Sequence, residues 1–596
     1  MSSSTSSQTS PSPPFQDRAE RRWQELQQEH ARLEQEMLQM RAAKYFSNYE
    51  IEIVFPAVIS PSSSSSSRST TTGTPSKPLR TNDEILQHRL MEAGILYDIP
   101  MKVSDVIQAS NEFIANLEQS GCFNAVRVEI GAPPVPESVA QEPTTTDRKA
   151  LRSLKVELEE AKWYRLYAGG GIKSESILQP ERLASESGVL NMAEAEISLG
   201  LRNLAGCLDT TTLQFTLDAK SLANWSLVHQ RPLYTVVPGI FKELLLTQPH
   251  GSQYTLHAKA VIDTTDLERT RSYKEFQRLI SLKATNTPMA SREQQAGSKF
   301  YYTAFEWMTV LRDIVPRRHM ILPFAFDASP AIVSQSGPSV KNSFLAEFRT
   351  NGSHLTKTVL GHDGEQMYEG LTQHPLQPTS GLQAHAEVEL ATPPGDVGFF
   401  KCQSGASLHL PIIQDSINNH MAMHLSLNAG YLHSLSFGGL CRPATISDRF
   451  FIGGPMQLRG FSPAGIGPRA YPQQAATKAS AGERIAGDAL GGDFYYTATA
   501  MASLSPTLFP QLHAMVGDQV ASAVRFFCFV NAGTCVGTIR STPVWAVLQS
   551  TRVSLGVGLS TTVAGPRLEV TYATPLRYGP RDMRRQFQFG IGFSIS

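Results

Sequence analysis

The last eleven residues of the chain alternate between apolar and small or polar side chains without an exception, and this pattern constrains the fold most. The apolar positions are Phe587, Phe589, Ile591, Phe593 and Ile595, and the positions beside them are Gln, Gly or Ser. Successive side chains of a β-strand point to opposite faces, so the pattern predicts a strand with one apolar face. Roughly ten residues is also the length at which a tilted strand crosses a bilayer.

Similar alternation recurs upstream, in residues 196–202, 212–218, 421–428, 552–560 and 567–572. Alternation alone fits a soluble sheet as well as a membrane barrel. The polar positions, however, are mostly Gly, Ser, Thr and Gln, and charged residues make up only 18% of the chain, against about 25% in soluble domains. A wet lumen with apolar side chains facing lipid explains this composition better than a water-exposed sheet does.

Residues 164–596 would supply about 16 strands at roughly 27 residues for each strand and its connection. An even number of strands closes a barrel and leaves no unpaired edge in lipid. We therefore predict a mainly β protein whose residues 164–596 form a 16-stranded antiparallel transmembrane β-barrel. The sequence contains no apolar run of about 18 residues, which argues against a helical membrane protein.

Two segments precede the folded region. Residues 1–15 are rich in Ser, Thr and Pro and are expected to be a disordered tail. Residues 16–45 carry Trp23, Leu26, Leu33 and Met37 at spacings typical of a helix, either one strand of a coiled coil or an amphipathic helix on the protein's own surface. No basic-then-apolar secretory signal is present, and the segment carries six acidic residues, unlike an acid-poor transit peptide, so we expect the precursor to keep its N-terminus.

Residues 50–160 have the pattern of a small α+β domain with the order β-α-α-β-β. Strand-like segments lie at 51–55, 123–130 and 154–158, and helical patterns lie near 85–90 and 106–117. Thr81 or Asn82 is expected to cap the first helix, and Ser104 the second. A Ser-rich insertion at 61–78 interrupts the domain and is expected to be a solvated loop.

The composition argues against several classes of function. The formal net charge is zero, so a nucleic acid is not an expected partner. The six cysteines lie far apart, and the sequence lacks the GxSxG, HExxH and GxxxxGK[ST] motifs. His420 and His424 form an i, i+4 pair, but in a strand they share a face as lumenal polar residues. We expect no catalytic residue, no metal and no cofactor.

One glycine-rich stretch identifies a family. Gly453 and Gly454 precede the tetrad Leu458-Arg459-Gly460-Phe461, which resembles the hallmark of the sixth extracellular loop in the BamA-type outer-membrane barrel-assembly superfamily. Residues 490–493 and 529–533 and the C-terminal segment fall in the order found in the mitochondrial member. Arg80-Thr81 and residues 121–123 resemble parts of a single POTRA domain, in agreement with the β-α-α-β-β order.

Within the superfamily, the chain is most similar to the core barrel subunit of the mitochondrial sorting and assembly machinery. It has room for one POTRA domain and shows no secretory signal, whereas bacterial members usually have several POTRA domains and a signal. Its C-terminus also fits the β-signal of mitochondrial barrel proteins, at the positions Gln588, Gly590, Phe593 and Ile595.

The resemblance implies an insertase. Such a protein folds β-barrel precursors and inserts them into the mitochondrial outer membrane through a lateral gate between its first and last strands, with the POTRA-like domain facing the intermembrane space. Its partners would be unfolded precursors, accessory assembly subunits and the lipid bilayer. Gly169, Gly170 and Gly171 in the expected first strand offer few side chains to pair across such a seam. Alternatively, these glycines form a tight turn at the rim.

The resemblance also places Arg459 in the lumen, where a guanidinium requires acceptors arranged around its fixed fork of donors. Asp493 is the first candidate partner, and Glu569, on the polar face of its strand, is the second. Alternatively, Arg459 lies in an exposed loop and binds water.

A second function remains open, that of a pore conducting polypeptides or metabolites. A simple porin needs neither a POTRA domain nor the Leu-Arg-Gly-Phe loop, but a polypeptide translocator has both features in some cases.

Overall fold

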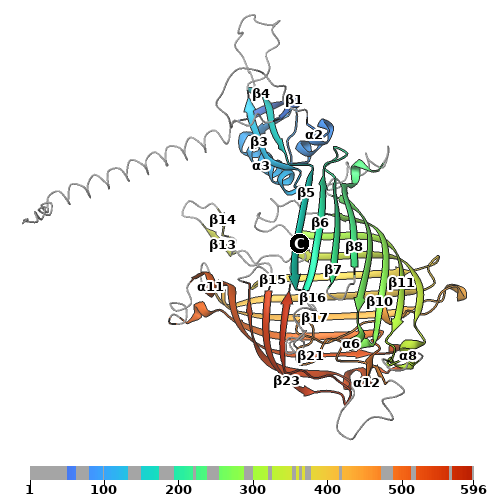
Figure 1. Ribbon diagram of the computed structural model, residues 1–596. Coiled ribbons are helices and arrows are strands. Elements are labelled where there is room, and N and C mark those ends of the chain that lie inside the picture. Colours follow the sequence, from blue (N-terminus) through green and yellow to red (C-terminus); the bar gives the residue numbers. More distant parts are fainter. Residues whose placement is uncertain are drawn as a thin grey trace, which may run out of the picture. The chain divides into compact units, whose positions relative to one another are not determined.

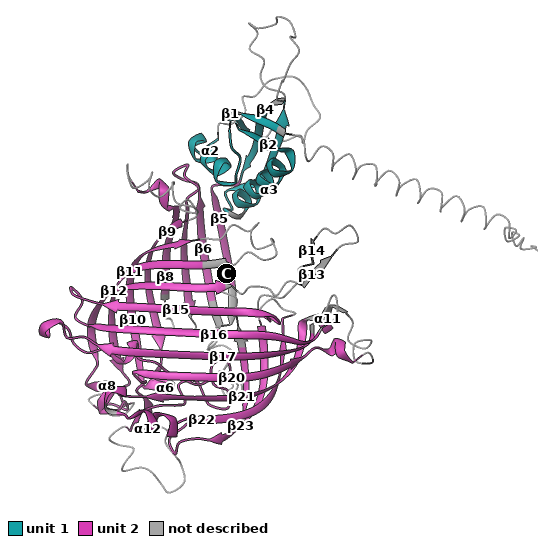
Figure 2. Ribbon diagram, turned by 180° about the vertical axis from the view of Figure 1, so that it is seen from behind, with its two compact units in different colours: residues 1–160 teal, residues 161–596 magenta. Residues whose placement is uncertain are grey.

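The computed structural model divides the chain into two compact units, residues 1–160 and 161–596 (Figure 2). It describes residues 50–61, 79–97, 99–131, 150–172, 193–218, 223–237, 254–286, 300–319, 325–351, 357–360, 366–369, 377–414, 419–471, 487–509, 511, 518–562 and 567–592. The predicted tail at 1–15, the helix at 16–45 and nearly all of the insertion at 61–78 therefore lie outside the described residues.

The first unit is a four-stranded mixed sheet with two helices. Its elements are β1 (Glu50–Pro61), α2 (Asp83–Glu92), β2 (Pro100–Lys102), α3 (Val103–Gln119), β3 (Phe123–Gly131) and β4 (Ala150–Glu160). The sheet order is β2-β1-β4-β3, with β1 parallel to β4. The sequence missed β2, because three residues are too few for alternation to be visible. Otherwise the order agrees with the POTRA-like pattern.

The helix caps were predicted with mixed success. Asn82 caps α2, since its side chain accepts a hydrogen bond from the Glu84 amide. The prediction for Ser104 was wrong: α3 begins at Val103, its N-cap is Lys102, and the Ser104 hydroxyl donates to Asp105 instead.

Glu160, the last residue of β4, joins the end of the sheet to the segment that precedes α2. Its Oε1 accepts hydrogen bonds from the backbone amides of Arg80 and Thr81, at 2.9 Å each, and from the Thr81 hydroxyl at 2.7 Å. Arg80 Nε lies 3.0 Å from Oε2. Burial raises the pKa of Glu160, but the hydrogen bonds from Thr81 and Arg80 outweigh burial and hold the pKa below its ordinary value of 4.5.

We expect Glu160→Gln to lower the free energy of unfolding of this unit by about 1–3 kcal/mol, because a neutral amide leaves buried donors unmatched. Hydrogen exchange of the unit's amides in the full chain would measure the change. Since the folded pKa is lowered, the carboxylate's contribution is complete above about pH 4.5 and is lost as the pH falls through the lowered pKa. Glu159→Gln, on an exposed strand position, is the control, and an equal effect of the two variants would contradict this role of Glu160.

The second unit is one antiparallel sheet of sixteen strands that curves into a barrel (Figure 1). This confirms the predicted fold class and strand number. The strands follow one another in chain order as β5 (Tyr164–Ile172), β6 (Ala193–Arg202), β7 (Thr210–Asp218), β8 (Ala223–Pro232), β9 (Tyr254–Asp266), β10 (Tyr273–Asn286), β11 (Phe300–Pro316), β12 (Gly337–Asn351), β15 (Gly381–Ala391), β16 (Phe399–Gln414), β17 (Asn419–Ser434), β20 (Phe494–Leu504), β21 (Val524–Val536), β22 (Arg552–Thr561), β23 (Arg567–Arg577) and β24 (Phe587–Gly592).

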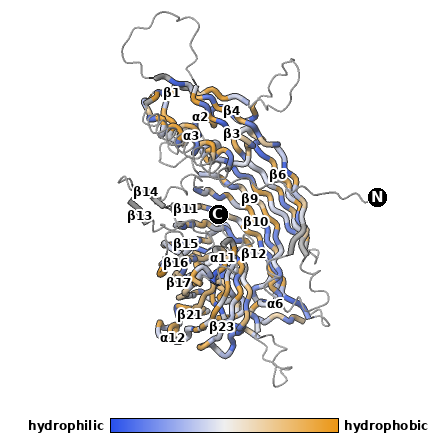
Figure 3. The backbone as a smooth tube through the Cα atoms, turned by 90° about the vertical axis from the view of Figure 1, so that its left-hand side faces the viewer, coloured by the Kyte–Doolittle hydropathy of each residue, from blue (hydrophilic) through white to orange (hydrophobic). Residues whose placement is uncertain are grey.

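Hydropathy alternates along the strands, as the colours in Figure 3 show. Since successive side chains of a strand point to opposite faces, this alternation separates apolar from polar side chains. In β22, Leu555 and Val557 are exposed on the outside while Ser554 is fully buried. In β23, Tyr572 is exposed while Glu569 and Thr571 are buried. The apolar outer face and the polar inner face are those expected of a barrel in lipid. None of the helices in the described ranges is long and apolar enough to cross a bilayer.

The connections between strands lie alternately at two ends of the barrel, because all neighbouring strands are antiparallel. We call the end at which β5 begins the near rim and the opposite end the far rim. The far rim holds α6 (Glu268–Arg271), α8 (Pro330–Val333), α12 (Val544–Gln549) and the connection from β17 to β20, whereas α11 (Asp518–Ala523) lies at the near rim. Figures 1 and 2 both show α6, α8 and α12 together at one end.

The remaining elements are short. The structure has 3-10 turns η3 (Leu233–Thr235), η5 (Phe437–Gly439), η6 (Ile446–Asp448), η7 (Pro506–Leu508) and η8 (Ile539–Ser541), and two small hairpins, β13 (Lys357–Leu360) with β14 (Gln366–Glu369) and β18 (Arg469–Ala470) with β19 (Asp488–Ala489).

Candidate functional site: the lumenal loop

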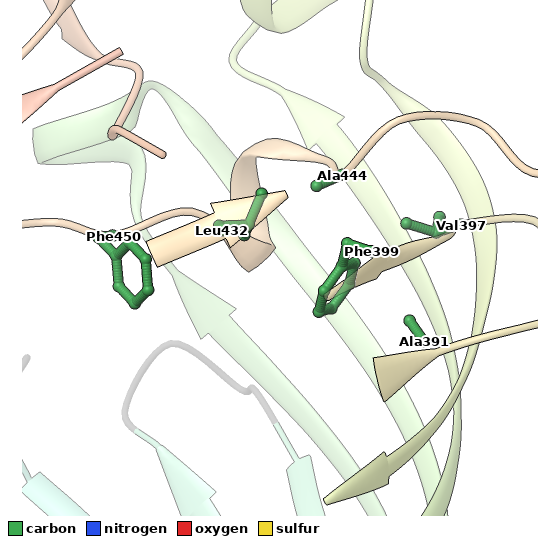
Figure 4. Packing of buried hydrophobic residues seen from close by; sticks show 6 residues of the cluster. All are labelled: Ala391, Val397, Phe399, Leu432, Ala444 and Phe450. Carbon is green, nitrogen blue, oxygen red and sulfur yellow. The ribbon is translucent and has the colours of Figure 1, made fainter. Parts of the chain in front are cut away.

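The connection between β17 and β20, residues 435–493, carries the Leu-Arg-Gly-Phe tetrad, and we call it the lumenal loop. Its first part packs on the ends of β15, β16 and β17 at the far rim. There Phe450 and Ala444 of the loop join the buried cluster of Ala391, Val397, Phe399 and Leu432 (Figure 4). The Phe450 and Tyr495 rings lie 4.8 Å apart between centroids. This apolar contact fixes the start of the loop against the inner wall.

A buried ion pair ties the same part of the loop to β11. Arg312 Nη1 and Nη2 lie 2.8 and 2.6 Å from the two carboxylate oxygens of Asp448, a bidentate arrangement. Both side chains are at most 3% exposed. Asp448 also accepts hydrogen bonds from the amide and the hydroxyl of Thr445, which closes the turn η6.

The glycines before and within the tetrad are required by backbone conformation and close approach. Gly453 has φ +131°, and a Cβ there would lie 2.1 Å from the carbonyl oxygen of Ser462. Gly460 has φ +90°, and a Cβ there would come within 3.1 Å of Ser554 on β22. The loop can therefore turn back and touch the barrel wall only with glycine at these positions.

The apolar members of the tetrad form the core of the loop. Leu458 and Phe461 are fully buried in a cluster with Ile452, Ile466 and Cys535. Gly454 shares the turn, since its amide donates to the Phe461 carbonyl at 2.8 Å. With these side chains facing inward, the loop presents Arg459 to the strands.

Arg459 points at the inner face of β23. Its Nε and Nη2 lie 2.6 and 2.5 Å from Oε1 of Glu569, whose side chain is fully buried. Its guanidinium carbon lies 5.5 and 5.0 Å from the ring centroids of Phe527 and Phe529, both buried on β21. The Ser554 hydroxyl donates to the Arg459 carbonyl at 2.6 Å. An arginine with a carboxylate and two aromatic faces around it is held in one position.

Gln588 joins the loop to the last strand. Its Oε1 accepts a hydrogen bond from the Gly460 amide at 3.0 Å, and its Nε2 donates to the Phe461 carbonyl at 2.6 Å. Gly590, on the same face of β24, lies against the loop as well, because a Cβ there would meet Pro455 at 3.1 Å. The loop thus contacts two of the four predicted β-signal positions. The other two, Phe593 and Ile595, lie outside the described residues.

Only one of the two candidate partners of Arg459 contacts it. Glu569 is its partner. The prediction that put Asp493 first was wrong: Asp493 stands just before β20 at the far rim, with its carboxylate 3.8 Å from Arg449 Nε. The Arg459 side chain instead reaches Glu569, the third residue of β23, which lies toward the near rim, so a carboxylate at the far rim is out of its reach.

Gly169, Gly170 and Gly171 lie within β5 and pair with Glu196, Ala195 and Glu194 of β6. The alternative of a tight turn was therefore wrong. Within the described residues, β5 pairs only with β6, and β24 pairs only with β23, over six residues. The glycines thus occupy one end strand of the sheet.

The sequence did not predict that Phe527, Phe529 and Ser554 contact Arg459. A signal was available in Phe526-Phe527-Cys528-Phe529-Val530, where alternation gives way to a continuous apolar run. Apolar residues on the inner face of a barrel strand indicate that something covers them. The histidines do lie as expected on the inner side, with His424 Nδ1 2.7 Å from His409 Nδ1 and His420 Nδ1 2.8 Å from the Thr507 hydroxyl.

A second segment reaches the lumen from the near rim and was not predicted. Gln377, which is buried just before β15, donates to the Ser560 hydroxyl on β22 at 3.2 Å. Because four strands lie between β15 and β22 in the sheet order, this contact crosses the interior of the barrel.

Residues 367–595, which include the lumenal loop and all strands from β15 to β24, match the family model described as the Omp85 superfamily domain. Residues 367–595 carry an Omp85 superfamily domain. The solved structure of BamA from Haemophilus ducreyi lacking POTRA domains 1–3 has the same fold as this chain, with a TM-score of 0.56 at 16% identity over 85% of this chain and 81% of that one. These findings confirm the family that the tetrad predicted.

Curated relatives of this chain are sorting and assembly machinery proteins. A SAM50-like protein of Schizosaccharomyces pombe is 27% identical over 45% of this chain and 47% of its own length. The sorting assembly machinery 50 kDa subunit of Saccharomyces cerevisiae is 27% identical over 45% and 49%. The human sorting and assembly machinery component 50 homolog is 27% identical over 41% and 47%. The chain spans about half the length of the curated relatives it matches.

Proposed function

We propose that this Omp85 chain folds β-barrel precursors and inserts them into the mitochondrial outer membrane. The observation that carries the proposal is the docking of the lumenal loop on the inner faces of β21–β24. The relatives are sorting and assembly machinery components, which agrees with such a role. The proposal requires no catalytic residue, since folding of the precursor supplies the free energy.

The finer proposal is a lateral gate between β5 and β24, the two end strands of the sheet. An incoming strand would add to an exposed edge by main-chain hydrogen bonds. Gly169 to Gly171 leave few side chains on β5 to resist its separation. Unfolded precursors and accessory subunits would be the partners, and the first unit would face the intermembrane space.

The second candidate, a pore for polypeptides or metabolites, has less support. The lumenal loop and the segment at Gln377 enter the lumen from opposite rims. Both would have to leave before a polypeptide could pass, and the loop is held by a buried ion pair. Insertion between β5 and β24 does not require either segment to leave the lumen.

A photoreactive residue in place of Leu166 on β5 is expected to cross-link a radiolabelled, arrested β-barrel precursor in isolated mitochondria. The same residue in place of Leu427 on β17 is the control, because both leucines are exposed on the outer face (68% and 56%) but only β5 is an end strand. Equal cross-linking at the two positions would contradict the gate. No cross-linking at either position, together with normal precursor insertion in mitochondria lacking the protein, would contradict the insertase itself.

A further inference from the structure

An uncovered apolar surface lies on the connection between β21 and β22. Its helix α12 has the sequence Val-Trp-Ala-Val-Leu-Gln, without a charged residue. Val547 is buried against the protein, whereas Val544, Trp545 and Leu548 are 77%, 62% and 60% exposed. These three positions fall within one arc of a helix, so they form one apolar face. Such a face on a connection requires a partner.

The helix is fixed beside the lipid-facing surface of the barrel. Arg577, at the end of β23, donates a hydrogen bond to the carbonyl of Gln549, the last residue of α12. Its neighbour Leu576 is 61% exposed, and Tyr572 of the same strand is exposed on the outer face. The apolar face of α12 therefore continues the outer apolar band at the level of the far rim, where aromatic side chains of membrane barrels meet the headgroups.

Exposed arginines lie on the two far-rim connections next to β22 and β23. They are Arg540 on the same connection as α12, Arg577 at the end of β23, and Arg581 and Arg584 on the connection from β23 to β24. Arg577 contacts α12 directly, and Arg581 lies 5.2 Å over the ring of Tyr471 in the lumenal loop. Arg540 bonds His433 at 2.7 Å, and Arg584 lies 4.2 Å over the Tyr578 ring. Within the described residues, none of the four forms an ion pair with a carboxylate.

The two connections also lack exposed acidic groups. Residues 537–551 contain no Asp or Glu, and residues 577–586 contain only Asp582. Asp582 is neutralised by Arg552, at 2.9 Å, and its side chain is 2% exposed. The surface formed by α12 and the four arginines, which we call the rim surface, is therefore apolar and positively charged at once.

We propose that the rim surface binds the bilayer at the far rim, with the apolar face of α12 in the headgroup layer and the four arginines on anionic lipid headgroups. An apolar face flanked by Arg is the composition of interfacial membrane helices. Guanidinium groups fit phosphate oxygens in a bidentate manner, and unpaired basic groups near a membrane attract anionic lipids. The continuity with the lipid-facing band favours lipid over a protein partner.

Quenching of tryptophan fluorescence tests this proposal on the full chain in vesicles. The contribution of Trp545 is the difference between the unchanged protein and Trp545→Phe. Vesicles contain brominated phosphatidylcholine or, at the same mole fraction, brominated phosphatidylserine. We expect Trp545 to be quenched by both lipids, and at least about twofold more strongly by phosphatidylserine, because the arginines enrich it locally.

A variant with Arg540, Arg577, Arg581 and Arg584 all changed to Gln should lose the preference for phosphatidylserine but keep quenching by phosphatidylcholine. Arg442→Gln is the matched control and should keep the preference, since Arg442 is a 62% exposed arginine on a far-rim connection that pairs with Asp396. Heat-dependent gel mobility verifies that each variant forms the barrel.

Three results would overturn the proposal. Quenching of Trp545 by aqueous iodide but not by bromolipid would show that α12 faces water. Protection from both quenchers would show that protein covers it. Equal quenching by the two bromolipids would show that the arginines do not bind anionic lipid headgroups preferentially. The test does not measure precursor insertion, so its outcome is independent of the proposed function.

Discussion

Replacing Arg459 by alanine is expected to remove most precursor insertion and to destabilise the barrel by about 3–5 kcal/mol. The change leaves the fully buried carboxylate of Glu569 without its closest cation. Arg567, whose Nη2 lies 3.2 Å from the other carboxylate oxygen, compensates in part. Import of a radiolabelled precursor measures insertion, and the temperature at which gel mobility changes measures stability.

Arg459→Lys is expected to restore only part of both properties, because an ammonium cannot form the planar fork. The pair itself is isolated by a double-mutant cycle of Arg459→Met with Glu569→Leu. The exposed pair Arg442 and Asp396 serves as the control, for which the coupling should not exceed about 1 kcal/mol. Strict additivity in the first cycle would show that the two side chains do not depend on each other, whatever their distance.

The second large effect is expected at Asp448. Asp448→Ala leaves the Arg312 guanidinium buried without a carboxylate, at a cost of about 3–5 kcal/mol. Because the pair joins the loop to β11, the first part of the loop should also become accessible to protease added from the far-rim side. Protease cleavage within residues 435–471, read by mass spectrometry, measures this release.

Thr445→Val separates two contributions of Asp448. It removes a hydrogen bond that closes η6 but leaves the ion pair, so we expect a loss of about 1 kcal/mol and no new cleavage. If Thr445→Val opened the loop as fully as Asp448→Ala did, the turn rather than the ion pair would hold the loop.

The sequence predicted the barrel better than the site, for physical reasons. Two-residue alternation is a local property, so β22, β23 and β24 could be recognised from their own residues. Between residues 220 and 420 the inner face carries more charge, with Lys283, Glu347 and Glu389 among the inward residues, and alternation alone did not set the strand limits there. The total of sixteen followed from chain length and from the need to close a barrel in lipid.

Contacts between distant segments could not be derived in this way. Arg459 and Glu569 are 110 positions apart, and only the family resemblance suggested that they meet. The prediction that placed Asp493 above Glu569 did not consider how far each residue lies from the rim of the barrel. Glu569 lies on the inner face of a strand, whereas Asp493 lies at a rim. The partners Phe527 and Phe529 were hidden because a lumenal aromatic residue is unexpected until the arginine that it contacts is known.

The contacts of Gln588 make the two sides of the seam unequal. Separating β5 at the proposed gate would break only its contacts with the strand across the seam. In contrast, β24 is bound both to β23 and to the lumenal loop, because the Gln588 side-chain amide bonds the Gly460 amide and the Phe461 carbonyl. A displacement of β24 would therefore also displace the loop and, through Arg459, strain its contact with β23. A displacement of β5 would require only bending at its glycines. If precursors enter between β5 and β24 as proposed, we expect β5 to be the strand that moves and β24 to stay with the loop.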